Sequence, residues 1–159
     1  MRIIVISDTH RRFNQFYDIV MKHKNEAFMF IHLGDGQKEV EDMLDLFPDL
    51  NLVSVRGNCD FASLNPETRV VFAGDERILC THGHSLSVKH SLEPLKQRAK
   101  EENCRIALYG HTHKSDTRYE DGIYILNPGS PSEPRDYTPS YGIIDIEKNG
   151  ILPFIVKIK

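Results

Sequence analysis

The first sixty residues contain apolar runs that alternate with amphipathic stretches. Residues 2–7, 28–33 and 52–55 are almost continuously apolar, which is typical of strands buried on both faces. Residues 13–24 and 40–47 between them carry apolar side chains at helical spacing. The order strand, helix, strand, helix, strand predicts βαβ units and a parallel sheet.

The second half of the chain reads as paired short strands. Apolar runs flank the turn signals Gly74-Asp75, Asp121-Gly122 and Asn149-Gly150, which predict hairpins over residues 69–81, 117–126 and 141–158. Residues 91–103 predict a helix and residues 105–109 a strand. Pro153 in the last run predicts an edge strand or a bulge. We therefore expect an α/β (α+β) fold, a four-layer αββα sandwich of two stacked mixed β-sheets flanked by helices.

Size, charge and cysteine content narrow the class of protein. A chain of 159 residues fits one domain, residues 1–159, and its net charge of -3 gives no strong nucleic-acid footprint. The three cysteines, Cys59, Cys80 and Cys104, do not form the pattern of a disulfide framework. Neither a signal peptide nor a bilayer-spanning run is present, so we expect a cytoplasmic protein without a membrane partner.

Polar fragments follow five of the strand-like runs. Strands of open α/β sheets collect ligands at their carboxyl ends, so these fragments are expected to meet. Carboxylate, amide and imidazole donors suit Mn, Fe or Zn ions, which predicts a metal-dependent hydrolase with two ions. The fragments are Ser7-Asp8-Thr9-His10, Gly34-Asp35-Gly36, Gly57-Asn58-Cys59-Asp60, Thr81-His82-Gly83-His84 and Gly110-His111-Thr112-His113.

Each fragment alone has a plainer interpretation. Asp8 fits a helix cap, and Gly-Asp-Gly around Asp35 fits a simple turn. Two His-x-His pairs in the same position after a strand are harder to explain in that way, and the convergence of all five fragments favours a site. Neither a glycine-rich phosphate loop nor a Gly-x-Ser-x-Gly nucleophile elbow is present.

The order of these motifs resembles that of the calcineurin-like metallophosphoesterases, and the short chain resembles their small YfcE-type phosphodiesterase branch. The resemblance implies that Asp8, His10, Asp35 and His113 hold one divalent ion, and that Asp35, Asn58, His82 and His111 hold a second. Asp35 would bridge the ions, for which Mn²⁺ is our first choice, with Zn²⁺, Ni²⁺, Fe²⁺ and Co²⁺ as alternatives. A metal-bridging hydroxide would then hydrolyse a small phosphodiester.

Cys59 departs from the family pattern, which has His at that position as the usual proton donor to the leaving alcohol. A thiol is a weak substitute, and His84 is our candidate replacement. Asp60 is expected to orient the site rather than bind metal. Arg135 is expected at the surface or in an ion pair, with contact to substrate phosphate as the second interpretation.

Two further expectations concern the segment that follows residue 126. Asn127-Pro128-Gly129-Ser130 fits a turn, with a peripheral role at the site as second choice. Residues 130–140, with three prolines, are expected to form an irregular loop over the site.

Three alternatives stay open from the sequence. A phosphomonoesterase would use the same ligands, a non-catalytic interaction scaffold such as the retromer subunit has a similar fold, and a metal-regulated protein could bind a phosphorylated ligand without turnover. The physiological substrate is not fixed, and a homodimer is possible.

Overall fold

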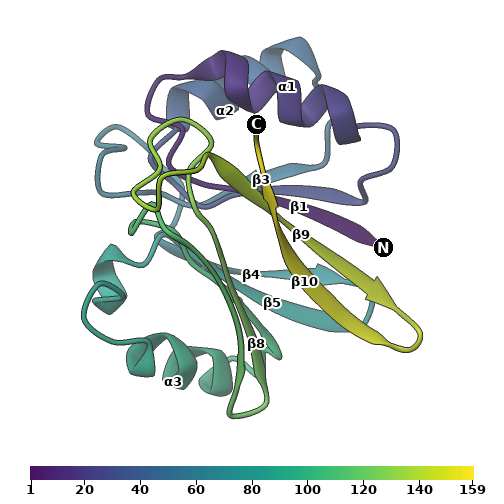
Figure 1. The fold of residues 1–159 in the computed structure, drawn as a ribbon, viewed down its shortest axis with the longest axis vertical. Coiled ribbons are helices and arrows are strands. Elements are labelled where there is room, and N and C mark those ends of the chain that lie inside the picture. Colours follow the sequence, from purple (N-terminus) through teal and green to yellow (C-terminus); the bar gives the residue numbers. More distant parts are fainter.

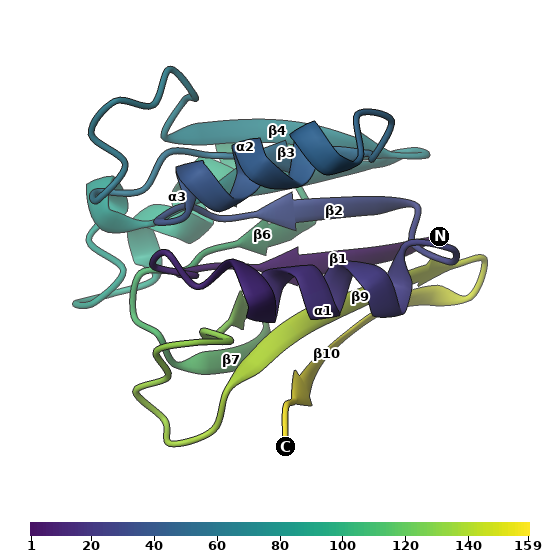
Figure 2. The ribbon, with the colours of Figure 1, turned by 90° about the horizontal axis from the view of Figure 1, so that it is seen from above.

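The structure, a computed structural model, describes residues 1–159 and contains two five-stranded sheets and three α-helices. The sheets lie face to face, with α1 and α2 outside the first sheet and α3 outside the second (Figure 1). The view from above shows α1 and α2 side by side on the first sheet (Figure 2). This arrangement confirms the predicted α/β sandwich with two mixed sheets.

The first sheet has the order β10-β9-β1-β2-β3, and the second has the order β4-β5-β6-β8-β7. The first sheet and its helices are β1 (Arg2–Ile6), α1 (Phe13–His23), β2 (Met29–His32), α2 (Gln37–Leu46), β3 (Leu52–Ser54), β9 (Ser140–Glu147) and β10 (Gly150–Lys157). The second sheet and its helices are β4 (Thr68–Ala73), β5 (Glu76–Thr81), the 3₁₀ helix η1 (His84–Leu86), α3 (Glu93–Glu101), β6 (Ile106–Leu108), β7 (Ser115–Glu120) and β8 (Ile123–Pro128).

The βαβαβ half forms as predicted. β1 pairs in parallel with β2, and β2 pairs in parallel with β3. Helix α2 begins at Gln37, three residues before the predicted start, because Oδ1 of Asp60 accepts hydrogen bonds from the backbone N–H groups of Gly36 and Gln37. A remote carboxylate thus satisfies donors that a helix leaves unpaired at its first turn.

The three predicted hairpins form, with one correction. The segment that starts at Asn127 is not a turn, because Asn127 and Pro128 end strand β8, where they pair with Asp116 and Ser115 of β7. Strand β7 begins two residues earlier than predicted, and among residues 127–130 only Gly129 has a positive φ, of 73°. Pro153 lies on the edge strand β10, whose pairing register is unbroken. The predicted edge strand is therefore confirmed, and the alternative of a bulge at Pro153 is wrong.

Three apolar clusters hold the layers together. A cluster of 15 buried residues lies between the two sheets and includes Ile3 and Ile31 of the first sheet and Ile78 and Ile106 of the second. Clusters of 10 and 9 buried residues attach α1 and α2 to the first sheet and α3 to the second. This packing fixes the ends of the strands of both sheets relative to each other. None of the helices is long and apolar enough to cross a membrane.

Candidate metal centre

The candidate ligands follow strands of both sheets. Asp8 and His10 follow β1, Asp35 follows β2, and Asn58 follows β3. From the second sheet, His82 follows β5, while His111 and His113 follow β6. The structure brings these seven residues together where the carboxyl ends of the parallel strands meet.

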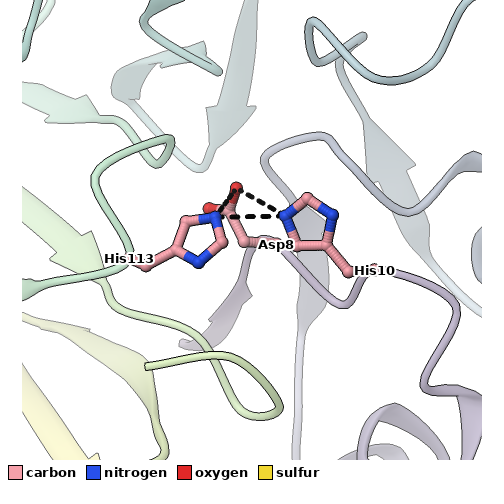
Figure 3. A group of neighbouring side chains, drawn as sticks. All are labelled: Asp8, His10 and His113. Carbon is pink, nitrogen blue, oxygen red and sulfur yellow. Dashed lines mark hydrogen bonds and ion pairs between the residues drawn. The ribbon is translucent and has the colours of Figure 1, made fainter. Parts of the chain in front are cut away.

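Asp8, His10 and His113 form the first group (Figure 3). Nε2 of His10 lies 3.1 Å from Nε2 of His113, and Oδ1 of Asp8 lies 3.2 Å from the same nitrogen of His113. Oδ2 of Asp8 accepts hydrogen bonds from Ser7 and from the backbone N–H of His111, whereas the buried Oδ1 has no hydrogen-bond partner. A buried acceptor without a partner, facing two imidazole nitrogens, fits a bound cation.

The second group is built around Asp35 and His82. Oδ2 of Asp35 lies 3.3 Å from Nε2 of His82 and 3.7 Å from Nε2 of His10, so this one oxygen faces both groups. Oδ1 of Asn58 lies 3.0 Å from Nε2 of His82. The ring of His111 completes the group, with its centroid 5.0 Å from that of His82.

Backbone carbonyls orient two of the imidazole rings. Nδ1 of His82 donates to the carbonyl of Leu33 over 2.7 Å, and Nδ1 of His113 donates to the carbonyl of Glu133 over 2.7 Å. Both rings therefore present Nε2 as the nitrogen with a free lone pair. Histidines that bind metals are commonly held by such a hydrogen bond at the other nitrogen.

Backbone strain concentrates at the same place. A positive φ is uncommon outside glycine and costs energy, and it persists where the surrounding structure enforces it. Five of the seven candidate ligands have a positive φ: Asp8 (59°), His10 (43°), Asp35 (56°), His111 (70°) and His113 (56°).

Asp60 orders the loops that carry Asp35 and Asn58. Its carboxylate accepts hydrogen bonds from four backbone N–H groups, including those of Asp35 and Gly57. Gly57 must be glycine, because a Cβ there would lie 2.1 Å from Oδ1 of Asp35. The carboxylate of Asp60 is fully used by the backbone, in agreement with the orienting role expected from the sequence.

A buried relay that the sequence analysis missed supports the loop between Asp8 and His10. The backbone N–H of Gly34 donates to Nδ1 of His32, whose Nε2 lies 3.0 Å from Oγ1 of Thr9. The hydroxyl of Thr9 donates to Oε1 of Glu39 over 2.9 Å, and the same oxygen accepts the N–H of Arg11. Glu39 is only 3% exposed. The sequence could have indicated this burial, because Glu39 lies four residues before the buried Met43 and therefore on the apolar face of α2.

The segment after β8 supports the opposite side of the site. Nδ2 of Asn127 donates to the carbonyl of Gly110 and to Oγ1 of Thr112, and the hydroxyl of Ser130 donates to the carbonyl of Asp8. The turn expected from the sequence is therefore a support for two ligand loops. Residues 130–139 are irregular, as predicted, and Glu133 among them holds His113.

The charges of the carboxylates and of His111 suit metal binding. Burial alone would raise the pKa of Asp8, but the facing imidazole rings of His10 and His113 outweigh it and hold the pKa below its ordinary value. Asp35 behaves in the same way, with His82 lowering its pKa to about 2. Burial, with the nearby charges of His82 and Lys89, lowers the pKa of His111 to about 4. Metal ligands must be deprotonated, and these three residues meet that condition at neutral pH.

The two candidate proton donors differ in position. Cys59 is exposed, and its sulfur lies within 4.8 Å of ligand atoms of His10 and Asp35. Partial desolvation of the thiol and the nearby carboxylate of Asp35 raise the pKa of Cys59 to about 11, so it keeps its proton at neutral pH. His84 lies next to the second group, 6.2 Å from His111 between ring centroids, with Nε2 at 3.3 Å from Glu67.

Arg135 is exposed and makes no ion pair, so the surface expectation was correct and the ion pair was not. A cavity of about 670 Å³ opens beside the first group. It is lined by His10, Asp35 and Cys59 on the side of the metal centre and by Phe61, Ser63 and Glu133 farther out.

Comparison with known proteins agrees with this geometry. Residues 1–149 match the model of the calcineurin-like phosphoesterase superfamily domain. The chain is 33% identical over 151 residues to the probable metallophosphoesterase YsnB of Bacillus subtilis, covering 94% of this chain and 86% of that protein.

Two solved structures extend the comparison. A predicted phosphoesterase from Streptococcus pneumoniae superimposes with a TM-score of 0.83 at 30% identity, over 98% of this chain and 88% of that one. A novel archaeal phosphodiesterase shares the fold, with a TM-score of 0.77 at 24% identity over 98% of this chain and all of the other. The chain therefore belongs to the calcineurin-like phosphoesterase superfamily, in its branch of small YfcE- and YsnB-type phosphoesterases.

Proposed function

We propose that this protein is a phosphodiesterase that hydrolyses a small phosphodiester with two divalent ions. Asp8, His10, Asp35 and His113 would hold the first ion, and Asp35, Asn58, His82 and His111 would hold the second. The observation that carries the proposal is the position of Oδ2 of Asp35, which faces His10 at 3.7 Å and His82 at 3.3 Å. A carboxylate in that position is suited to bridge two cations.

Two such ions, when bound, supply Lewis acidity and lower the pKa of a water for in-line displacement at phosphorus. The residues of the chain provide the rest. Asp60 and the relay from His32 to Glu39 keep the ligand loops in place. Asn58 and Asp35 then present their oxygens to the same centre without reorganisation, which is the form in which polar groups contribute most to catalysis.

The leaving alcohol needs a proton, and we propose His84 as its source. The Nδ1 atom of His84 is buried without a hydrogen-bond partner, and its ring lies 5.5 Å from that of His82 between centroids. Cys59, in the position where the family has His, is the competing donor. Its high pKa makes it a slow acid in water-like surroundings.

Diester rather than monoester cleavage is the finer part of the proposal. It is supported by the similarity in fold to the archaeal phosphodiesterase. Mn²⁺ is our proposed native metal, because oxygen and imidazole ligands without thiolate suit it. The three free cysteines support a location in the cytoplasm. We also propose that residues 1–159 act as one domain, since one apolar cluster joins both sheets.

The proposal is tested by stripping the protein of metal and restoring Mn²⁺, Ni²⁺, Zn²⁺ or Mg²⁺ one at a time. Each form is assayed with bis(p-nitrophenyl) phosphate and with p-nitrophenyl phosphate. We expect metal-restored diester cleavage that Asp35→Asn abolishes. The control is Asp18→Asn, an exposed aspartate on α1, which should retain full activity.

The alternatives give different results in the same assay. A preference for the monoester would keep the metal centre and move the substrate to phosphomonoesters. If calorimetry showed tight Mn²⁺ binding but neither ester were turned over, the proposed enzymatic activity would be rejected. An interaction scaffold or a binding protein would then be favoured. A homodimer through the exposed edge strand β10 stays a prediction, which sedimentation velocity tests.

A further inference from the structure

A second cavity, of about 650 Å³, borders the loop that carries His111 and His113. Its lining comes from four separate segments: the chain after η1, the loop after β6, strand β7 and the loop before β9. The charged residues among them are Lys89, Lys114, Asp116, Arg118 and Arg135. The cavity shares no lining residue with the one beside the first ligand group.

The charge of this cavity is opposite to that of the first. Its only carboxylate, Asp116, is paired with Arg118 through a 2.6 Å hydrogen bond from Nε to Oδ2. Lys89, Lys114 and Arg135 are exposed and make no ion pair, so three positive charges face the same space without a partner.

The first cavity, in contrast, is lined by five carboxylates against two full cations. The carboxylates are Asp35, Glu39, Glu41, Asp60 and Glu133, and the cations are Arg11 and Lys38. The net charge of -3 for the whole chain hides this separation. Beyond the metal ions themselves, an anionic group of the substrate would therefore be attracted by the side chains of the second cavity and not by those of the first.

The three unpaired cations are tied to the candidate metal ligands. The backbone N–H of Arg135 donates to the carbonyl of His113 over 2.8 Å, and Lys114 is the next residue after His113. Lys89 is close enough to His111 for its charge to contribute, after burial and His82, to the lowered pKa of that imidazole. A group bound by these cations would thus lie beside His111 and His113, two of the three ligands contributed by the second sheet.

We propose that this cavity binds a second phosphate group of the substrate, so that the preferred substrate is a phosphodiester bearing another phosphate next to the scissile one. Nucleotide diesters with a terminal phosphate belong to this class. Arginine and lysine together suit phosphate, because the guanidinium fork binds two of its oxygens and the ammonium groups balance its remaining charge. This inference rests on the proposed phosphodiesterase function and narrows its substrate.

The test compares the thymidine dinucleotide TpT with the same dinucleotide carrying a terminal phosphate at the 3′ or 5′ end. The Mn²⁺-loaded protein is assayed for kcat and KM on each. We expect at least one terminal phosphate to lower KM about tenfold, which corresponds to about 1.4 kcal/mol. In the double variant Lys114→Gln/Arg135→Gln the ratio of KM values with and without the phosphate should fall toward one. Lys148→Gln, an exposed lysine in the β9–β10 turn, is the matched control and should keep the wild-type ratio.

A ratio of one in the wild type, or an unchanged ratio in the double variant, would overturn the inference while cleavage of TpT upholds the phosphodiesterase. Failure of the proposed function itself would appear as no cleavage of any dinucleotide. A second measurement does not depend on turnover: NMR titration of the metal-free protein with inorganic phosphate should shift the amides of Thr112, Lys114 and Arg135. These shifts should be lost in the double variant and kept in Lys148→Gln. Their absence from the wild type would contradict the inference.

Discussion

Nε2 of His10 lies 3.1 Å from Nε2 of His113, although His10 follows a strand of the first sheet and His113 follows a strand of the second. Two imidazole nitrogens at this distance repel each other unless a proton or a cation lies between them. The free Oδ1 of Asp8 faces the same space. A metal ion there would join the two sheets at one end of the sandwich, so metal binding should be coupled to folding.

We first predict that removing metal lowers the thermal stability. An ion at 100 times its dissociation constant stabilises the folded state by about 2.7 kcal/mol. For a domain of this size each kcal/mol shifts the unfolding midpoint by roughly 2–4 °C, so a chelator should lower it by roughly 5–10 °C. Calorimetry with and without saturating Mn²⁺ measures the shift.

His113→Ala should lose most of this metal-dependent shift, because it removes a proposed ligand that links the sheets. His90→Ala, at an exposed histidine, serves as the control and should keep it. An equal shift in both variants would show that the stabilising ion binds elsewhere.

The order of the site along the chain could be predicted because each fragment follows an apolar run that only a buried strand explains. The meeting of His10 and His113 was implied only by the family resemblance, since no local pattern encodes how two sheets stack. The same limit applies to Asn127 and Pro128, whose turn-like sequence is overridden by pairing with β7. The direction of His84, toward Glu67, likewise depends on a contact that no local pattern encodes.

We next predict that Glu39→Gln weakens metal binding without touching a ligand. Its carboxylate accepts hydrogen bonds from Thr9 and from the N–H of Arg11, which flank His10 in the chain. Groups that orient metal ligands typically change metal affinity 10–100-fold when replaced, so we expect roughly a tenfold loss. Calorimetric titration of the metal-free variant with Mn²⁺ measures it.

Glu41→Gln is the matched control, because Glu41 lies two residues further along α2 and is exposed. It should bind Mn²⁺ as tightly as the wild type. The positioning role of Glu39 would be rejected by equal affinities of the two variants.

A third prediction concerns the leaving-group acid. His84→Ala should lower kcat for hydrolysis of an unactivated dinucleotide about 100-fold, which is within the usual contribution of a general acid. It should lower kcat for bis(p-nitrophenyl) phosphate much less. The reason is that nitrophenolate leaves without protonation. The ratio of kcat values on the two diesters isolates this effect from loss of binding.

Cys59→Ala on the same two diesters provides the comparison. We expect it to change both rates by a similar, small factor. The reverse pattern, with the dinucleotide selectively slowed in Cys59→Ala and not in His84→Ala, would assign the proton to the thiol.

The last prediction concerns the pH dependence of stability at the ion pair between β1 and β9. Arg2 contacts Asp145 through two hydrogen bonds of 2.8 Å, Nε to Oδ1 and Nη2 to Oδ2, and this pairing lowers the pKa of Asp145. A carboxyl whose pKa is lower in the folded state stabilises the fold above its unfolded pKa of about 3.9. That contribution is lost as the pH falls through the lower pKa of the folded state.

Asp145→Asn should therefore lower the free energy of unfolding by about 1 kcal/mol at pH 7, in line with a partly exposed ion pair, and by almost nothing near pH 2. Urea unfolding of both proteins from pH 2 to pH 7 measures this, with Asp18→Asn as the exposed control; a cost that does not change with pH would show that Asp145 acts through packing and not through its charge.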